Sequence, residues 1–592
     1  MTTSADGFAG RVEAFLAETF ALDPIRATDA GMHGHDTEWP DWSDEGRRAR
    51  IAFADRWLTE LRAFPDGELT ADQRIDRDQL VGELEALRFS ETDLRQDAWD
   101  ALAWVEGIGT GLFLILAREY APPPVRVAAL TGRLAALPRV VDAAIDALVG
   151  LPGIPVSRLH AETAVDQLPG VSELVAEAVS WAEDAATADG DVAHLLPDLR
   201  AAADQARDAV GRLEAHVRDV VLPSSEGEGR LGAERFEHQL RHTLRDPEVD
   251  AERLLGRAER EARAVRAEMR RIAIELWPAR LPGRPLPADE GQIIRGVLDA
   301  IAAEHPAADD LLDACRTRLA EIEAFCRQKG LIGLAAEPLT IDWAPAFLRG
   351  FGGASLWSPG PLDRSLPALF LITPVPDEWS ADERESWLRE LNDRQISLLT
   401  IHEAVPGHYL QGVRANEEPS IVRTVFGSGV FAEGWAVYVT QVMIDAGFDS
   451  DDLALRLVHW KFYLRAILNA ILDIRVHAHG MTEEDAIALL VDGGFQEPSE
   501  ARNKFKRARL TSAQLSTYFV GGTALQDLEV EVRRRAAARV GIAWERAGDG
   551  DLPGGHGDSP GFARRQHLEA VIAHGTPPIP LLRRILLDDE ES

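Results

Sequence analysis

The chain has 592 residues, of which 45% are apolar, and this length is too great for one ordinary hydrophobic core, so we predict more than one lobe. The formal net charge of -35 argues against nucleic acid and anionic membranes as partners. Only two cysteines, Cys315 and Cys326, are present, which indicates a reducing compartment without a disulfide framework.

The first 330 residues read mainly as helices. Near the N-terminus, Val12, Phe15, Leu16 and Phe20 recur at helical spacing among polar or small residues. This segment lacks a basic region followed by a long apolar core, so it predicts an amphipathic helix rather than a signal peptide. No stretch comes near the roughly 18 uninterrupted apolar residues of a membrane span. We therefore expect a cytoplasmic protein.

The character of the sequence changes after residue 331. Residues 338–345 (PLTIDWAP) and 367–376 (PALFLITPVP) are short β-branched or apolar runs bounded by proline, which predict strands. A glycine-rich segment at 347–363 lies between them without a phosphate-binding pattern. We predict a flexible loop there, and a mainly α fold with a small β-sheet near the active site.

The most informative stretch is 402–408, which reads His-Glu-Ala-Val-Pro-Gly-His. The usual zinc-protease motif places two histidines four positions apart on one helical face, with a glutamate as general base. Here the second histidine comes six positions after the first, about 240° around an ideal helix. His402 and His408 can share a metal only if the helix is broken between them. Pro406 favours a break because it has no N–H for the carbonyl of His402, and Gly407 permits backbone angles that other residues resist.

An acidic residue follows inside an apolar stretch. Glu433 comes 25 residues after His408, within the sequence Phe-Ala-Glu-Gly-Trp-Ala. A buried carboxylate without a partner is costly, so Glu433 needs one. Two histidines, one glutamate and an open position for water form the catalytic zinc site of many metallopeptidases. We therefore predict Zn²⁺ as the cofactor, bound by His402, His408 and Glu433.

The rest of the chain reads as helices. A basic cluster at 504–509 precedes Tyr518 and a glycine pair, and it stands out in an acidic chain. The alternative interpretation is a helix whose basic residues pair with acidic neighbours. The glycine-rich residues 548–561 predict a surface loop in which His556 is solvated.

These motifs resemble the DUF885 family of bacterial proteins, which is itself similar to helical gluzincin peptidases of the oligopeptidase and carboxypeptidase types. The resemblance covers most of the chain. It depends on the following residues: His402, Glu403, Pro406, Gly407, His408, Glu433, Gly434, Trp435, Ala436, Tyr438, Asp473, His477, Arg507, Gln514, Tyr518, Gly521, His567, Gly575, Pro577, Pro24, Ala27, Thr28 and Gly31. The sequence departs from the family pattern at Asn469, where an arginine is usual, and at Gln566, where an aromatic residue precedes the histidine.

The resemblance implies a zinc site and two lobes around a deep channel. We accordingly expect a mainly helical N-terminal lobe over residues 1–330. A zinc-binding catalytic lobe, with the small sheet and the C-terminal helices, is expected over residues 331–592. In this lobe Glu403 is the expected general base and then general acid.

Four further residues receive expected roles on this interpretation. Tyr518 donates a hydrogen bond to the tetrahedral oxyanion, and Arg507 binds a substrate carboxylate in a bidentate way. His477 and His567 bind substrate or the oxyanion, with hydrogen-bonded structural histidines as the alternative.

We predict a zinc-dependent hydrolase that cleaves amide bonds of short peptides. Two alternatives remain open, namely a zinc amidohydrolase for a small acyl-amino metabolite and a non-catalytic binding protein on a peptidase scaffold. The three predicted ligands occur together with Glu403, which favours an enzyme. The expected partner is a short peptide or small amide, with no nucleic acid and no membrane.

Overall fold

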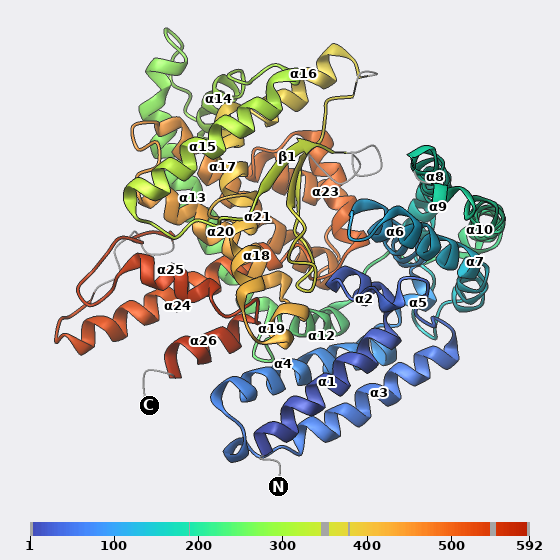
Figure 1. Ribbon diagram of the computed structural model, residues 1–592. Helices are drawn as coiled ribbons and strands as arrows, with labels where there is room; N and C mark the ends of the chain where they lie inside the picture. Colours follow the sequence, from blue (N-terminus) through green and yellow to red (C-terminus); the bar gives the residue numbers. More distant parts are fainter. Residues whose placement is uncertain (1–3, 189, 345–353, 377–378, 545–551, 589–592) are drawn as a thin grey trace. The chain divides into compact units, whose positions relative to one another are not determined.

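The computed structural model describes residues 4–188, 190–344, 354–376, 379–544 and 552–588. The chain divides into two compact units: the first comprises Met1–Arg230 and Pro359–Leu366, and the second comprises Leu231–Ser358 and Pro367–Ser592. Within the described residues most of the chain is helical and one three-stranded sheet is present (Figure 1). The predicted mainly α fold with a small sheet is confirmed.

Helices build the first unit. They are α1 (Ser4–Leu22), α2 (Pro24–Ala30), α3 (Asp44–Arg62), α4 (Ala71–Phe89), α5 (Gln96–Trp99), α6 (Ala101–Ala117), α7 (Pro123–Ala147), α8 (Arg158–Ala188), α9 (Gly190–Ala193), α10 (Leu196–His216) and α11 (Leu222–Ser224). The apolar positions that predicted the first helix, Val12, Phe15, Leu16 and Phe20, are all buried. No single described helix is long and apolar enough to cross a membrane, and Ala71–Trp99 with Ala101–Ala117 meets that requirement only as a pair bent by 100°.

The second unit contains the sheet and the remaining helices. Its elements are α12 (Ala233–Leu244), α13 (Ala251–Arg280), α14 (Glu290–Ala302), α15 (Leu311–Lys329), β1 (Leu339–Trp343), β2 (Ala354–Trp357), β3 (Ala368–Ile372), α16 (Ala381–Glu390), α17 (Asp393–Glu403), α18 (His408–Glu417), α19 (Ile421–Val425), α20 (Gly429–Asp445), α21 (Leu453–Ala478), α22 (Glu483–Ala488), α23 (Pro498–Leu510), α24 (Thr517–Arg539), α25 (Arg564–Ile572) and α26 (Ile579–Asp588).

The division between the units differs from the boundary predicted at residue 330. Helix α13 packs along α21, and the buried Tyr463 hydroxyl donates a hydrogen bond of 2.7 Å to Glu261. Residues 231–330 therefore belong with the C-terminal part of the chain. Their amphipathic pattern predicts helices, but it does not tell which other helices cover them.

The sheet packs beside the helix that carries the first histidine of the motif. Its strand order is β1-β3-β2, with β1 parallel and β2 antiparallel to β3. Ile341, Phe370 and Ile372 share one apolar core with Ile396 and with Ala404, the residue directly after α17. The sheet therefore packs against the end of α17, the helix that carries His402.

The connection between β2 and β3 belongs to the first unit. Leu362 donates a backbone hydrogen bond of 2.9 Å to Ala30, and the Nε2 atom of His33 lies 2.8 Å from a carboxylate oxygen of Asp363. The first part of the predicted loop at 347–363 falls on residues 347–353, which lie outside the described residues.

Candidate metal centre

The helix is broken between the two histidines of the motif, as predicted. Helix α17 ends at Glu403 and α18 begins at His408. Between them the Val405–Pro406 peptide bond is cis. The Pro406 carbonyl accepts a hydrogen bond of 2.8 Å from the indole of Trp435, which is fully buried in α20. The Phe-Ala-Glu-Gly-Trp-Ala stretch therefore fixes the break as well as contributing Glu433.

Gly407 is required by a close approach of the backbone. Its φ of -72° lies outside the left-handed region that favours glycine. A Cβ atom at this position, however, would lie 1.9 Å from the carbonyl oxygen of His402 and 2.3 Å from that of Ile401. The glycine therefore lets the chain turn back against the end of α17, which brings His408 next to His402.

The three predicted ligands converge. The Nε2 atoms of His402 and His408 lie 3.7 Å and 3.6 Å from the same Glu433 oxygen, Oε2. The two imidazole rings are nearly perpendicular, with centroids 4.8 Å apart. Ligand atoms at about 2.1 Å from a tetrahedral zinc ion lie about 3.4 Å from one another. Within the described part of the chain, this is the only such group of three His, Cys, Asp or Glu residues.

A cation fits this group because one ligand atom lacks a partner. Glu433 Oε2 is buried and accepts no hydrogen bond from any described residue. A buried carboxylate oxygen without a donor is costly, and an ion between the three residues would remove that cost. His402 Nδ1 also has no hydrogen-bond partner among the described residues, so the contact that usually orients a metal-binding histidine is missing here.

The charges of the three side chains support the same assignment. Burial raises the pKa of Glu433, but its contacts with His402 and His408 outweigh burial and hold the pKa well below its usual range. Burial lowers the pKa of His408, but Glu433, and then Glu403, raise it above its usual value. Without a metal, Glu433 is therefore ionised, and a proton on His408 is favoured beside it. Metal binding would displace such a proton.

Glu403 lies half-buried at the end of α17, directly after His402. Its negative charge contributes to the raised pKa of His408. No hydrogen bond or ion pair joins its carboxylate to another described residue. The carboxylate is therefore available to accept a proton near the candidate metal centre.

Two glycines bring Tyr518 beside Glu433. Helices α20 and α24 pack against each other, and a Cβ atom on Gly521 would lie 2.1 Å from the Val430 carbonyl oxygen. A Cβ atom on Gly434 would lie 2.4 Å from the Gly521 carbonyl carbon. Burial, and then the charge of Glu433, raise the pKa of Tyr518. The hydroxyl is therefore protonated at neutral pH and able to donate.

We expect Gly521→Ala to damage this crossing. The added methyl group has to push the two helices apart, which should lower the free energy of unfolding by about 1–3 kcal/mol and weaken zinc binding. Gly256→Ala in α13 is the matched control, because its nearest neighbour would lie at an ordinary 3.7 Å. Chemical denaturation and zinc titration measure both effects. Equal stability and zinc affinity in the two variants would contradict the account of the crossing.

A row of polar residues leads from Tyr518 to Arg507. The Gln514 amide nitrogen lies 3.5 Å from the Tyr518 hydroxyl, and Arg507 donates a hydrogen bond of 3.0 Å to the Gln514 side-chain oxygen. Arg507 is exposed at the end of α23. The structure thus places the predicted anion-binding arginine next to the predicted oxyanion donor.

His477 and Asp473 hold the chain segment before Tyr518. The Nε2 atom of the buried His477 lies 2.7 Å and 2.8 Å from the carbonyl oxygens of Ala508 and Thr511. Asp473 accepts hydrogen bonds of 2.8 Å and 3.1 Å from the hydroxyl and the backbone of Ser516. Burial raises the pKa of Asp473 to about 7. These contacts give His477 the structural role that was the alternative to substrate binding.

His567 belongs to a different cluster, around Glu529. It is buried in α25, and burial lowers its pKa to about 4. Its electrostatic neighbours are Glu529, Arg533 and His556, and not the three candidate ligands. The structure therefore offers no support for the predicted contact between His567 and the substrate.

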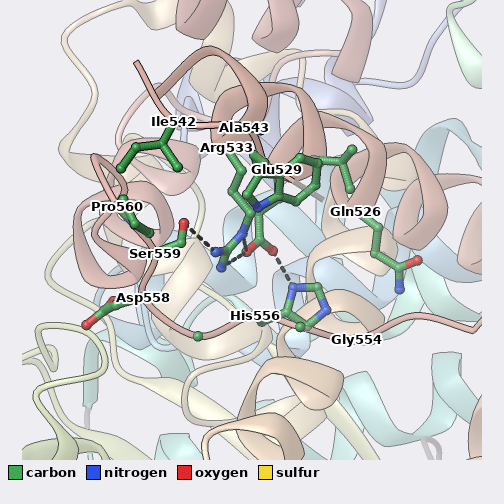
Figure 2. Close-up of a pocket in the computed structure, with 14 residues that line it drawn as sticks. Gln526, Glu529, Arg533, Ile542, Ala543, Gly554, His556, Asp558, Ser559 and Pro560 are labelled. Atoms are coloured by element: carbon green, nitrogen blue, oxygen red, sulfur yellow. Dashed lines mark hydrogen bonds and ion pairs between the residues drawn. The ribbon is translucent and has the colours of Figure 1, made fainter. Parts of the chain in front are cut away.

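Three members of this cluster, Glu529, Arg533 and His556, line a pocket of about 520 Å³ (Figure 2). Glu529 lies between Arg533, which donates a hydrogen bond of 2.7 Å, and the ring of His556. The Tyr438 hydroxyl donates a hydrogen bond of 2.7 Å to Glu529. His556 is buried, so the prediction that it is solvated is wrong. Its charged partner Glu529 is far away in sequence, which explains why the glycine-rich loop pattern did not reveal it.

Two aromatic residues at the centre had no predicted role. Phe462 on α21 packs edge-on against His402 with ring centroids 5.5 Å apart, and Trp435 fixes the Pro406 carbonyl. Trp435 directly follows Gly434 and comes two positions after Glu433. A large apolar residue so close to a predicted ligand could have indicated a structural role at the centre. Phe462 gave no such signal, because its helix comes from a separate part of the chain.

Comparisons with known proteins agree with the fold. A family model described as a bacterial protein of unknown function (DUF885) matches residues 24–586. A solved structure of a proposed lipoprotein of unknown function from Shewanella oneidensis is 28% identical, with a TM-score of 0.80, covering 98% of this chain and 99% of that one. A proposed lipoprotein from Colwellia psychrerythraea is 15% identical, with a TM-score of 0.78, covering 100% of both chains. No curated protein matches.

Proposed function

The chain belongs to the DUF885 family of bacterial proteins, whose function is unknown, and we propose that it is a zinc-dependent hydrolase that cleaves amide bonds of short peptides. The observation that carries the proposal is the convergence of His402, His408 and Glu433, with a buried Glu433 oxygen that has no hydrogen-bond donor. Two histidines and a glutamate are the ligand set of many zinc peptidases. The likeness to gluzincin-type peptidases rests on this site and its motif.

The proposed chemistry combines the metal with two side chains. A bound zinc ion supplies a Lewis acid and lowers the pKa of its water towards about 7. Glu403 accepts the proton of the attacking water on its carboxylate and then delivers it to the leaving amine nitrogen. The Tyr518 hydroxyl donates a hydrogen bond to the carbonyl oxygen as negative charge develops there.

We expect Tyr518→Phe to retain zinc and to lower kcat by about 10²–10³, the usual effect of removing one oxyanion donor. The phenylalanine keeps the ring packed near Glu433 and removes only the hydroxyl. Steady-state kinetics measures the rate and elemental analysis measures the zinc. A variant with wild-type kcat would exclude Tyr518 as the oxyanion donor.

The substrate position is proposed from the residues around the centre. Arg507, joined to Tyr518 through Gln514, is the proposed anchor for a negatively charged substrate group. Strand β2 lies at one edge of the sheet, and a peptide backbone can bind to such an edge by strand addition. His477 and His567 lie outside this proposed substrate path.

A mixed peptide library tests the proposed function. The zinc-loaded protein is incubated with the library and with a set of acyl-amino acids, and the products are identified by mass spectrometry. Cleavage of peptides that stops with a chelator and returns with zinc supports the proposal. Cleavage of acyl-amino acids alone would support the metabolite amidohydrolase. Bound zinc with no cleavage of either class would support the non-catalytic binding protein.

A cytoplasmic location stays a prediction for this chain. The two proteins of similar structure are described as lipoproteins, and that description applies to them. Fractionation of cells that produce the full-length protein distinguishes a cytoplasmic location from a membrane-attached one.

A further inference from the structure

Four basic side chains lie in one region of helices α21 and α23. Lys461 and Arg465 come from α21, and Lys504 and Arg507 come from α23. Burial, and then the positive charges of Arg465 and Arg507, lower the pKa of Lys504. Arg507 also donates a hydrogen bond to Gln514, and its positive charge opposes the rise of the Tyr518 pKa that burial causes. This basic region therefore reaches the candidate active site.

Two of the four cations have acidic partners. Arg465 and Lys461 lie 3.0 Å and 3.3 Å from the two carboxylate oxygens of Glu390, and Arg465 also pairs with Glu500. These two carboxylates balance the charges of Lys461 and Arg465. The α21 side of the region is therefore close to neutral.

The other two cations are not balanced. Among the described side chains, the Nη2 atom of Arg507 donates a hydrogen bond only to the neutral Gln514. The half-buried Lys504 forms no hydrogen bond and no ion pair within 4.0 Å with any residue that the structure describes. In a chain with a net charge of -35, this local excess of positive charge is unusual.

The surroundings of Lys504 favour an anion. Burial, and then the positive charge of Arg465, lower the pKa of Lys504 to about 7, although Glu500 and Glu390 act in the opposite direction. A partly buried ammonium group gains hydrogen bonds and electrostatic stabilisation when a carboxylate binds beside it. An arginine one turn further along the helix provides two more donors for the same carboxylate.

We propose that Lys504 and Arg507 together bind a carboxylate of the substrate, so that the enzyme selects peptides with a negative charge close to the cleaved bond. The inference rests on the proposed hydrolase function and adds the substrate class. Arg507 adjoins the Tyr518 hydroxyl, so the bound carboxylate lies near the scissile amide. Its source is the C-terminal carboxylate of the peptide or an acidic side chain, which have the same recognition chemistry.

Matched peptides test the proposal. One pair differs only in a free or amidated C-terminus, and a second, amidated pair differs only in a glutamate or glutamine next to the cleaved bond. We expect kcat/KM to be at least about tenfold higher for the charged peptide of one pair. The neutral peptide of that pair cannot form the charged hydrogen-bonded contact. The pair that shows the preference identifies the source of the carboxylate.

Lys504→Met tests the residue itself. The methionine keeps the apolar part of the side chain, and we expect KM for the preferred charged peptide to rise about tenfold with little change for its neutral partner. Lys506→Met is the control, because Lys506 is exposed two positions away. A general loss of rate on both peptides, or equal behaviour of the two variants, would overturn the role of Lys504.

A binding measurement separates this inference from the proposed function. Calorimetry with the charged and the neutral peptides on Glu403→Gln protein needs no turnover. Suppose that the wild-type protein cleaves no peptide, but that the charged peptide binds more tightly than the neutral one and loses this advantage in Lys504→Met. The hydrolase proposal then fails and the carboxylate site stands. Cleavage of charged and neutral peptides at equal rates, with equal binding, would overturn the carboxylate site alone.

Discussion

Replacing His408 with alanine is expected to abolish zinc binding. The variant leaves His402 and Glu433 as the only protein ligands, and two ligands do not form the three-ligand set of a catalytic zinc site. We expect the zinc content to fall from about one ion per chain to a small fraction of that value after dialysis. Elemental analysis of the purified protein measures the ratio, and circular dichroism verifies that the helical fold is retained.

The matched control is His194→Ala. His194 is exposed in the first unit, so its removal changes the histidine count without changing the candidate centre. We expect this variant to keep the zinc content of the wild type. A wild-type protein that binds no zinc even after zinc is added would remove the proposed metal centre, and so would equal zinc contents in the two variants.

Glu403→Gln is expected to keep zinc and to lose hydrolytic activity by about 10³-fold or more. Glutamine has nearly the same size as glutamate, so the end of α17 and the positions of His402 and His408 should not change. It cannot accept the proton of the attacking water, and it cannot deliver a proton to the leaving amine. The loss should therefore fall on kcat, with little change in KM.

Kinetics on a cleaved peptide measures this effect, with Glu484→Gln as the control. Glu484 is exposed near the start of α22 and should tolerate the same change. If Glu403→Gln turns over as fast as the wild type, Glu403 is not the general base. If it loses zinc together with activity, its role is to support the metal centre instead.

Local chemistry in the sequence was enough to predict the main features around the candidate metal centre in the second unit. Pro406 predicted the break between α17 and α18, because a proline removes a helix hydrogen bond wherever it stands. Glu433 was identifiable because an acidic residue in an apolar stretch requires a partner. Strands β1 and β3 followed from β-branched runs bounded by proline. Each of these conclusions depends on a residue and its near neighbours in the chain.

Features that depend on distant contacts were not predictable. The hydrogen bond between Trp435 and the Pro406 carbonyl joins two residues that the sequence does not link. The sequence shows His477, His556 and His567 as similar candidates, but their roles depend on which groups from other helices face each ring. The boundary at residue 330 differs from the observed division because helix periodicity reveals an apolar face without its packing partner.

A diffraction experiment on crystals of the zinc-loaded protein, recorded at the zinc absorption edge, tests the metal centre most directly. We expect one anomalous peak about 2.0–2.2 Å from His402 Nε2, His408 Nε2 and a carboxylate oxygen of Glu433. A zinc peak bound by other residues, or no peak among these three side chains at saturating zinc, would contradict the proposed function.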